Sequence, residues 1–162
     1  GLRFNMHYLN TSAAEIRAKV KLTILAAPAG TVQHKAGFLF MNNVGINVAP
    51  RSKGTATKTC AIPPNIQIMD LVSHMHMHAT RIVAKTASGR LVYEGTEWDH
   101  PTPSIFTPPL ALGTDTQVTW TCSYDNQGDT PLSFGESAAT NEMCILGGTF
   151  FPAPERSFAC LL

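Results

Sequence analysis

The sequence contains little charge of either sign, and that charge is not clustered. Only 14% of the 162 residues are charged, the formal net charge is +1, and no run of Lys or Arg occurs. A domain that binds nucleic acid or an anionic membrane surface would concentrate basic residues on one face. We therefore expect neither nucleic acid nor a membrane as a partner.

Long apolar runs and internal repeats are also missing. Uncharged stretches are interrupted before they reach the roughly 20 residues that a membrane-spanning helix needs. Hydrophobic residues make up 44% of a chain that has the length of one domain with one core. We expect a single domain over residues 1–162. The interruptions are Pro28, Asn42-Asn43, Pro50, Pro63 and Pro101.

The four cysteines include no Cys-x-x-Cys pair, the close spacing on which zinc ribbons depend. Reduced core residues, a zinc site and two disulfides are the alternatives, and this spacing favours disulfides, with three connectivities open. Disulfides would indicate an oxidising compartment, and the protein is expected to be secreted, extracellular or periplasmic. No signal peptide is visible and Gly1 comes first, which is typical of a mature product or an excised segment. The cysteines are Cys60, Cys122, Cys144 and Cys160.

Alternation of polar and apolar residues is the dominant pattern. Gln117–Tyr124 alternates throughout, which predicts a half-buried strand with Cys122 pointing inward. Ile16–Ile24 also alternates, and although Ser12–Glu15 resembles a helix capping box, the alternation favours a strand. Further strands are expected at Arg90–Glu94 and Met143–Phe151. Short strands separated by turn residues predict an all-β fold, an antiparallel jelly-roll-like β-sandwich.

Three histidines, His74, His76 and His78, occupy alternate positions in one short run that is flanked by apolar residues. Alternate residues of a strand share one face, so a strand here would present three imidazoles side by side. Same-face neighbours stand roughly 6.5 to 7 Å apart, and two imidazoles can share one metal ion at bonds of about 2.0 Å. A metal site is the leading hypothesis, with a histidine-rich surface strand as the alternative.

The other ligands decide which metal would be bound. A zinc enzyme would add a third histidine or a carboxylate, whereas a Cu(I) site prefers a thioether beside imidazole. His7, His34 and His100 lie far from the run, as does Met143. A cupin-type iron or manganese site would need a glutamate soon after the second histidine, and residues 79–81 provide none.

Two motifs in this order, His74-Met75-His76 and then Glu142-Met143-Cys144, resemble those of the copper type II, ascorbate-dependent monooxygenases. That family contains peptidylglycine α-hydroxylating monooxygenase and dopamine β-monooxygenase, and the resemblance is to its C-terminal domain. Phe4–Tyr8 and Lys35–Phe40 are similar to further strands of the family, so the resemblance covers nearly the whole chain. It implies that His74, His76 and Met143 are the catalytic copper ligands. It also implies the disulfides Cys60–Cys160 and Cys122–Cys144.

The resemblance further implies an enzyme. In the family, dioxygen is activated at this copper and a C–H bond of a small organic substrate is hydroxylated, with ascorbate as the reductant. A second copper, held by three histidines of the preceding domain, supplies the other electron, and His7 resembles one of those ligands. An upstream copper domain is therefore an expected partner. A non-catalytic copper-binding module for storage, delivery or electron transfer would use the same ligands and is the alternative.

Three positions depart from the peptide-processing branch of the family. That branch carries an arginine two residues before the first copper histidine, and asparagine and tyrosine shortly after Glu-Met-Cys. This chain has Val72, Ile145 and Gly147 there, which disfavours a peptidylglycine substrate. His78 has no counterpart in the family pattern. We expect it to be a surface histidine, with an alternate metal ligand as the second interpretation.

Overall fold

The structure is a computed structural model that describes residues 6, 8, 10–153 and 158–160. Two units are distinguished, residues 1–33 and residues 34–162. All strands of the described residues belong to the second unit, and we describe each unit by itself.

The first unit contains no strand or helix among its described residues. Residues 12–14 form a bend, in which the side chain of Asn10 donates a hydrogen bond to the carbonyl of Ala14 at 2.7 Å. The strand expected at Ile16–Ile24 is wrong, because this stretch pairs with no strand of the described structure and its residues are exposed. Alternation supplies one apolar face, but a strand also needs a neighbouring strand to take up its backbone hydrogen bonds.

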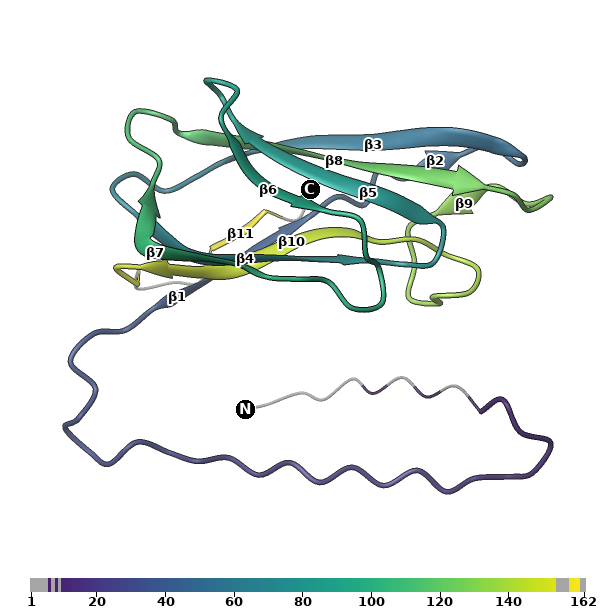
Figure 1. The fold of residues 1–162 in the computed structure, drawn as a ribbon, viewed down its shortest axis with the longest axis horizontal. Coiled ribbons are helices and arrows are strands. Elements are labelled where there is room, and N and C mark those ends of the chain that lie inside the picture. The colour runs from purple at the N-terminus through teal and green to yellow at the C-terminus, as the bar shows by residue number, and fades with distance from the viewer. Residues whose placement is uncertain (1–5, 7, 9, 154–157, 161–162) are drawn as a thin grey trace. The chain divides into compact units, whose positions relative to one another are not determined.

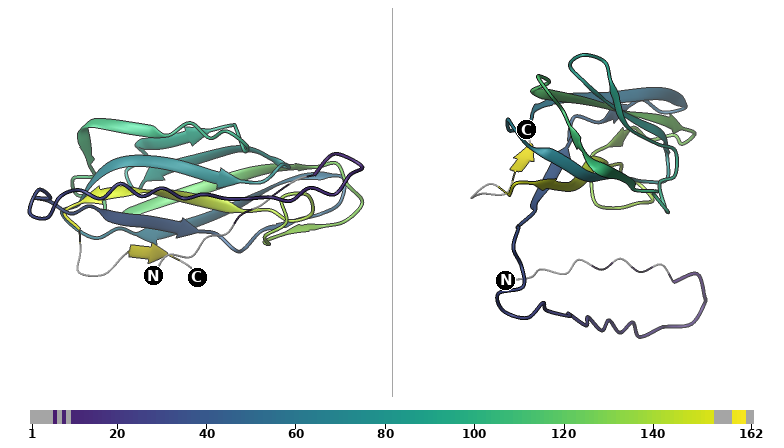
Figure 2. Two further views of the ribbon diagram at one scale, coloured as in Figure 1. Left: turned by 90° about the horizontal axis from the view of Figure 1, so that it is seen from below. Right: turned by 60° about the vertical axis from the view of Figure 1, so that its left-hand side comes forward.

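The second unit is an all-β sandwich, and its two larger sheets form the separate layers seen in Figures 1 and 2. One layer is a five-stranded sheet in the order β11-β1-β10-β4-β7. Its pairs are antiparallel except β1 with β11, which are parallel and lie side by side at the sheet edge (Figure 2). The strands are β1 (Gly37–Asn42), β4 (Gln67–Met75), β7 (Ser104–Ala111), β10 (Cys144–Phe151) and β11 (Phe158–Cys160).

The other layer is a four-stranded antiparallel sheet in the order β3-β8-β5-β6. A short two-stranded sheet, β2-β9, lies at one end of the fold. The strands expected near residues 90–94, 117–124 and 143–151 are thus confirmed with small changes of bounds. The strands of these two sheets are β2 (Asn47–Val48), β3 (Ser52–Ala61), β5 (Ala79–Thr86), β6 (Leu91–Gly95), β8 (Gln117–Asn126) and β9 (Leu132–Ser133).

The core between the layers follows from period-two alternation, as the sequence predicts for β8. Its inward residues Val118, Trp120, Cys122 and Tyr124 are at most 1% exposed. From the facing sheet, β10 contributes Cys144, Leu146 and Phe150, each fully buried. Inward side chains of both sheets therefore meet in one apolar layer, the arrangement that defines a β-sandwich.

Both disulfides implied by the family resemblance are present. Cys122 of β8 and Cys144 of β10 join the two sheets with Cα atoms 5.9 Å apart. Cys60 of β3 and Cys160 of β11 do the same with Cα atoms 6.2 Å apart. Both separations lie within the range of protein disulfides. Two disulfides fit an oxidising compartment, where such bonds persist.

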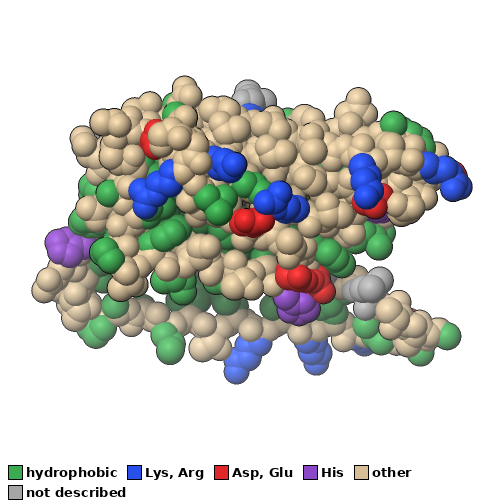
Figure 3. All heavy atoms as spheres, turned by 45° about the horizontal axis from the view of Figure 1, so that its top comes forward, with side chains coloured by type: hydrophobic (Ala, Val, Ile, Leu, Met, Phe, Trp, Pro, Cys, Tyr) green, Lys and Arg blue, Asp and Glu red, His purple; other side chains and the backbone are tan. Residues whose placement is uncertain are grey.

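The surface carries charge of both signs. Figure 3 shows Lys and Arg side chains interspersed with Asp and Glu on the face that it draws. Two exposed ion pairs join Arg51 with Asp129 at 2.6 Å and Arg81 with Glu94 at 2.7 Å. Within the described part of the chain, no helix is long and apolar enough to cross a membrane.

Candidate metal centre

Strand pairing brings the two candidate ligand motifs together. In the antiparallel register of β4 and β10, Cys144 lies opposite Met75 and Ile145 lies opposite His74. Met143 precedes Cys144 and His76 follows Met75, so both residues adjoin this last pair. The histidine motif and the methionine, far apart in sequence, are therefore neighbours at the same end of the same strand pair.

The expected strand with three histidines on one face is wrong. Strand β4 ends at Met75, and Met77 and His78 form a turn that is closed by a hydrogen bond from the N–H of Ala79 to the carbonyl of His76, at 3.0 Å. Only His74 lies within the strand, and His76 follows it directly. At this turn the carboxylate of Glu142 accepts the backbone N–H groups of His76 and His78. These donors therefore turn toward a side chain instead of a neighbouring strand.

The imidazoles of His74 and His76 nevertheless lie close together. Their ring centroids are 5.3 Å apart and their planes are nearly perpendicular, at 89°. His76 is 2% exposed, whereas His74 is on the surface. Imidazoles at this separation are close enough for one nitrogen of each to reach a shared ion at bonds of about 2.0 Å.

The orientation of the His76 ring is set by a backbone carbonyl. Its Nδ1 lies 2.9 Å from the carbonyl oxygen of Asn141. A carbonyl oxygen only accepts, so Nδ1 carries the proton and donates it. Neutral His76 then presents the lone pair of Nε2, the arrangement found in metal-binding histidines whose other nitrogen is held by a hydrogen bond.

Glu142 belongs to the Glu-Met-Cys motif, but the sequence assigned it no role of its own. Its side chain is fully buried. Oε2 accepts the backbone N–H of His76 at 3.2 Å, and Oε1 accepts the backbone N–H of His78 at 2.8 Å. Oε1 also lies 2.9 Å from Nδ1 of His78, whose side chain is 20% exposed. The signal was present in the sequence, because period two places residue 142 on the same inward side as Cys144.

The backbone on both sides of the Met143–Cys144 bond is fixed by β8. The hydroxyl of Tyr124 donates to the carbonyl of Met143 at 3.2 Å, and Nε1 of Trp120 donates to the carbonyl of Cys144 at 3.3 Å. Between these two aromatic residues, Cys122 forms the disulfide with Cys144. Burial raises the pKa of Tyr124, and the nearby charge of Glu142 raises it further. Met143 itself is half-buried, so part of its side chain reaches the surface.

Apolar residues adjoin His74 along the five-stranded sheet. Ile145 is the cross-strand partner of His74, and in the next outward position Gly147 pairs with Val72. Val72 and Ile145 are half-buried. The positions at which the peptide-processing branch carries polar side chains thus lie next to the candidate ligands, and here they offer no charge to a substrate.

The remaining histidines have other neighbours. His34 packs edge-on against Phe151 with centroids 5.3 Å apart, and exposed His100 pairs with Asp99 at 3.1 Å. His7 lies outside the described residues. Across the described ranges, no three side chains drawn from His, Cys, Asp and Glu are grouped so as to hold a metal ion. Among the described residues, His78 therefore does not form a three-histidine group with His74 and His76.

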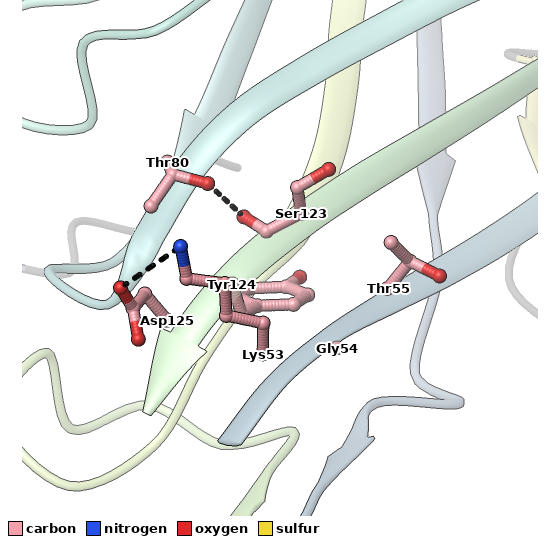
Figure 4. A pocket seen from close by; sticks show the side chains of 7 residues that line it. All are labelled: Lys53, Gly54, Thr55, Thr80, Ser123, Tyr124 and Asp125. Carbon is pink, nitrogen blue, oxygen red and sulfur yellow. Dashed lines mark hydrogen bonds and ion pairs between the residues drawn. The ribbon is translucent and has the colours of Figure 1, made fainter. Parts of the chain in front are cut away.

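A separate hollow lies on the outer side of the four-stranded sheet. Figure 4 shows Lys53 paired with Asp125, at 3.9 Å, and Thr80 donating to the carbonyl of Ser123, at 3.2 Å. Thr55 and Tyr124 also line it. No imidazole or thioether is among the lining residues, so this hollow is distinct from the candidate metal centre.

Comparison with known proteins adds no assignment: no family model matches this chain, and no curated protein matches it.

Proposed function

We propose that this chain is the copper-binding domain of an ascorbate-dependent monooxygenase that hydroxylates a C–H bond of a small organic substrate. His74, His76 and Met143 would hold one copper ion. The observation that carries the proposal is the register of β4 and β10, which pairs Cys144, the residue after Met143, with Met75, the residue between two imidazoles whose centroids are 5.3 Å apart.

The donor set fits copper. Two imidazoles and one thioether form a soft site of low coordination number, which suits Cu(I) and leaves positions open. His76 is already held with Nε2 available, and the backbone of Met143 is fixed by Tyr124. Bound copper would supply one-electron chemistry toward dioxygen.

The protein would orient the ligands and select the substrate. Val72 and Ile145 present aliphatic side chains next to His74, which favours an apolar substrate portion over a carboxylate. The overall reaction joins one oxygen atom to the substrate carbon and reduces the other to water, consuming two electrons and two protons. Ascorbate would supply both electrons, one of them by way of an upstream copper domain.

The cellular setting follows from the same proposal. The two disulfides support an oxidising compartment, and we propose that the protein is secreted to the extracellular space or the periplasm. His7, which resembles a ligand of the family's second copper, would contribute to that upstream site.

Copper stoichiometry and oxygen uptake test the proposal. We expect this chain to bind one equivalent of copper tightly and to consume little oxygen with ascorbate. A longer protein that includes the upstream copper domain should couple oxygen uptake to substrate hydroxylation. Failure of this chain to bind copper would refute the proposal. Tight copper binding without substrate-dependent oxygen uptake by the longer protein would instead identify a module for copper storage, delivery or electron transfer.

A further inference from the structure

We infer that Glu142 is the positioning residue of this centre. Its carboxylate shapes the turn at residues 76–79, the histidine turn, and its backbone holds Met143 beside that turn. The inference rests on the proposed function for its metal, but the geometry of the turn is testable without any metal.

The carboxylate is the acceptor around which the turn is built. Three N–H groups converge on it, the backbone amides of His76 and His78 and the Nδ1 of His78. An ionised carboxylate that is 0% exposed is strongly destabilising unless donors replace its hydration. These hydrogen bonds are charge-assisted and therefore stronger than those between neutral groups. The turn and the buried charge thus stabilise each other.

The backbone of Glu142 is fixed at both ends. Its N–H donates to the carbonyl of Ser133 at 2.9 Å, and its carbonyl accepts the N–H of Gly135 at 3.2 Å. The residue before it, Asn141, orients the His76 ring, and the residue after it is Met143. Three consecutive residues therefore act on one centre, with Glu142 in the middle.

This arrangement gives His78 a role that the sequence did not reveal. Its Nδ1 lies 2.9 Å from Oε1 of Glu142, so the ring adds a third N–H donor to the carboxylate. His78 is thus a partner of the positioning carboxylate. Glu142 is fully buried, and both of its oxygens accept hydrogen bonds from the turn.

Replacing the carboxylate by an amide changes geometry and charge together. In Glu142→Gln, the amide NH₂ would face N–H donors, so the turn loses one or more of its hydrogen bonds. The variant also removes one buried negative charge close to the metal. That loss weakens the binding of Cu(II) more than that of Cu(I), because the ion of higher charge gains more from a nearby anion.

The first experiment uses metal-free protein. We expect the amides of His76 and His78 to be protected from hydrogen exchange in the wild type, and expect Glu142→Gln to lose that protection while β8 keeps its own. ¹⁵N NMR of the wild type should show both imidazoles protonated at Nδ1. Unchanged protection in Glu142→Gln, or an Nε2-protonated His78, would overturn the inference. The ring measurement needs no variant and decides the matter even if Glu142→Gln fails to fold.

The matched control is Glu136→Gln, which removes the same charge from the same loop. Glu136 is exposed and forms no hydrogen bond or ion pair with any described residue. It should leave the exchange pattern and copper binding as in the wild type.

The second experiment titrates Cu(I) and Cu(II) into the same proteins. Loss of a residue that orients metal ligands typically lowers affinity 10- to 100-fold. We expect about this loss for Glu142→Gln, larger for Cu(II), with an altered Cu(II) EPR spectrum. Wild-type copper affinity in a folded Glu142→Gln protein would overturn the positioning role. Absence of copper binding by the wild type, with the metal-free results as expected, would refute the proposed function and leave Glu142 as the organiser of the turn.

Discussion

The hydroxyl of Tyr124 in β8 donates a hydrogen bond to the carbonyl oxygen of Met143, across the interior of the sandwich. Two residues earlier along β8, Cys122 is bonded to Cys144, and two residues earlier again, Trp120 donates to the carbonyl of Cys144. The sheet that carries no candidate ligand therefore fixes the strand that carries the thioether. The core of the fold and the geometry of the proposed centre depend on the same contacts.

Met143→Ile should weaken the binding of Cu(I) more than that of Cu(II), because a thioether prefers the softer ion. Competition titrations with chelators specific for each oxidation state measure this. Met77→Ile is the control, since Met77 lies in the histidine turn but is 50% exposed. Equal losses for both ions would reject Met143 as a ligand, and a selective Cu(I) loss in Met77→Ile would transfer that role to Met77.

Tyr124→Phe should lower the free energy of unfolding by about 1 kcal/mol, the usual net contribution of one hydrogen bond. The carbonyl of Met143 would lose its donor while the aromatic packing stays. Urea unfolding of metal-free protein measures the change. A variant as stable as the wild type would show that the hydrogen bond contributes nothing.

The ionisation of Tyr124 should make the stability of the fold depend on pH, with a definite sign. The pKa of Tyr124 is raised above its ordinary 10.0, so the folded protein holds the phenol proton more tightly than the unfolded chain does. This contribution to stability is fully present below pH 10 and is lost as the pH rises above it. Wild-type stability should therefore fall more steeply than that of Tyr124→Phe between about pH 10 and 12. Parallel curves would contradict the shift.

Removal of either disulfide should destabilise the fold, but only one should affect the metal centre. Replacing Cys122 and Cys144 by Ala should lower stability by roughly 2 to 5 kcal/mol and also reduce Cu(I) affinity, because Cys144 adjoins Met143. The pair Cys60 and Cys160 serves as control, with a similar stability loss and unchanged affinity in the folded protein. Equal losses of Cu(I) affinity in the two double variants would show that the stability of the fold alone governs copper binding.

Gly135→Ala should disturb the centre from outside it. A Cβ at this position would lie 2.5 Å from Cγ of Asn141, closer than atoms can approach. Asn141 would be displaced, and its backbone carbonyl could no longer accept the hydrogen bond from the ring of His76 as it does now. We expect a loss of about 1 to 3 kcal/mol in stability and weaker copper binding. Ser137→Ala, at an exposed position in the same loop, should change neither.

Part of the second unit, strands β6, β8 and β10, could be predicted from local pattern. Period-two alternation identified β8 and its inward residues, because one face of each strand is buried and a register slip would expose it. The same pattern failed at Ile16–Ile24, since an alternating segment specifies which face is apolar and says nothing of which strand lies beside it. Pattern alone therefore predicts strands only where the fold supplies a partner.

The sequence by itself determined the all-β class, and it supplied the residues of the proposed ligand set, a His-x-His pair and a later methionine. It also placed residue 142 on the same side as Cys144, although that signal was not used. Only the tertiary structure decided where β4 ends, which way His78 turns and what holds His76. The reason is physical: a buried carboxylate must be satisfied by whatever donors the folded chain brings to it, and here those donors belong to the histidine turn. The spacing of the histidines along one strand does not show which acceptor another segment of the chain will place beside them.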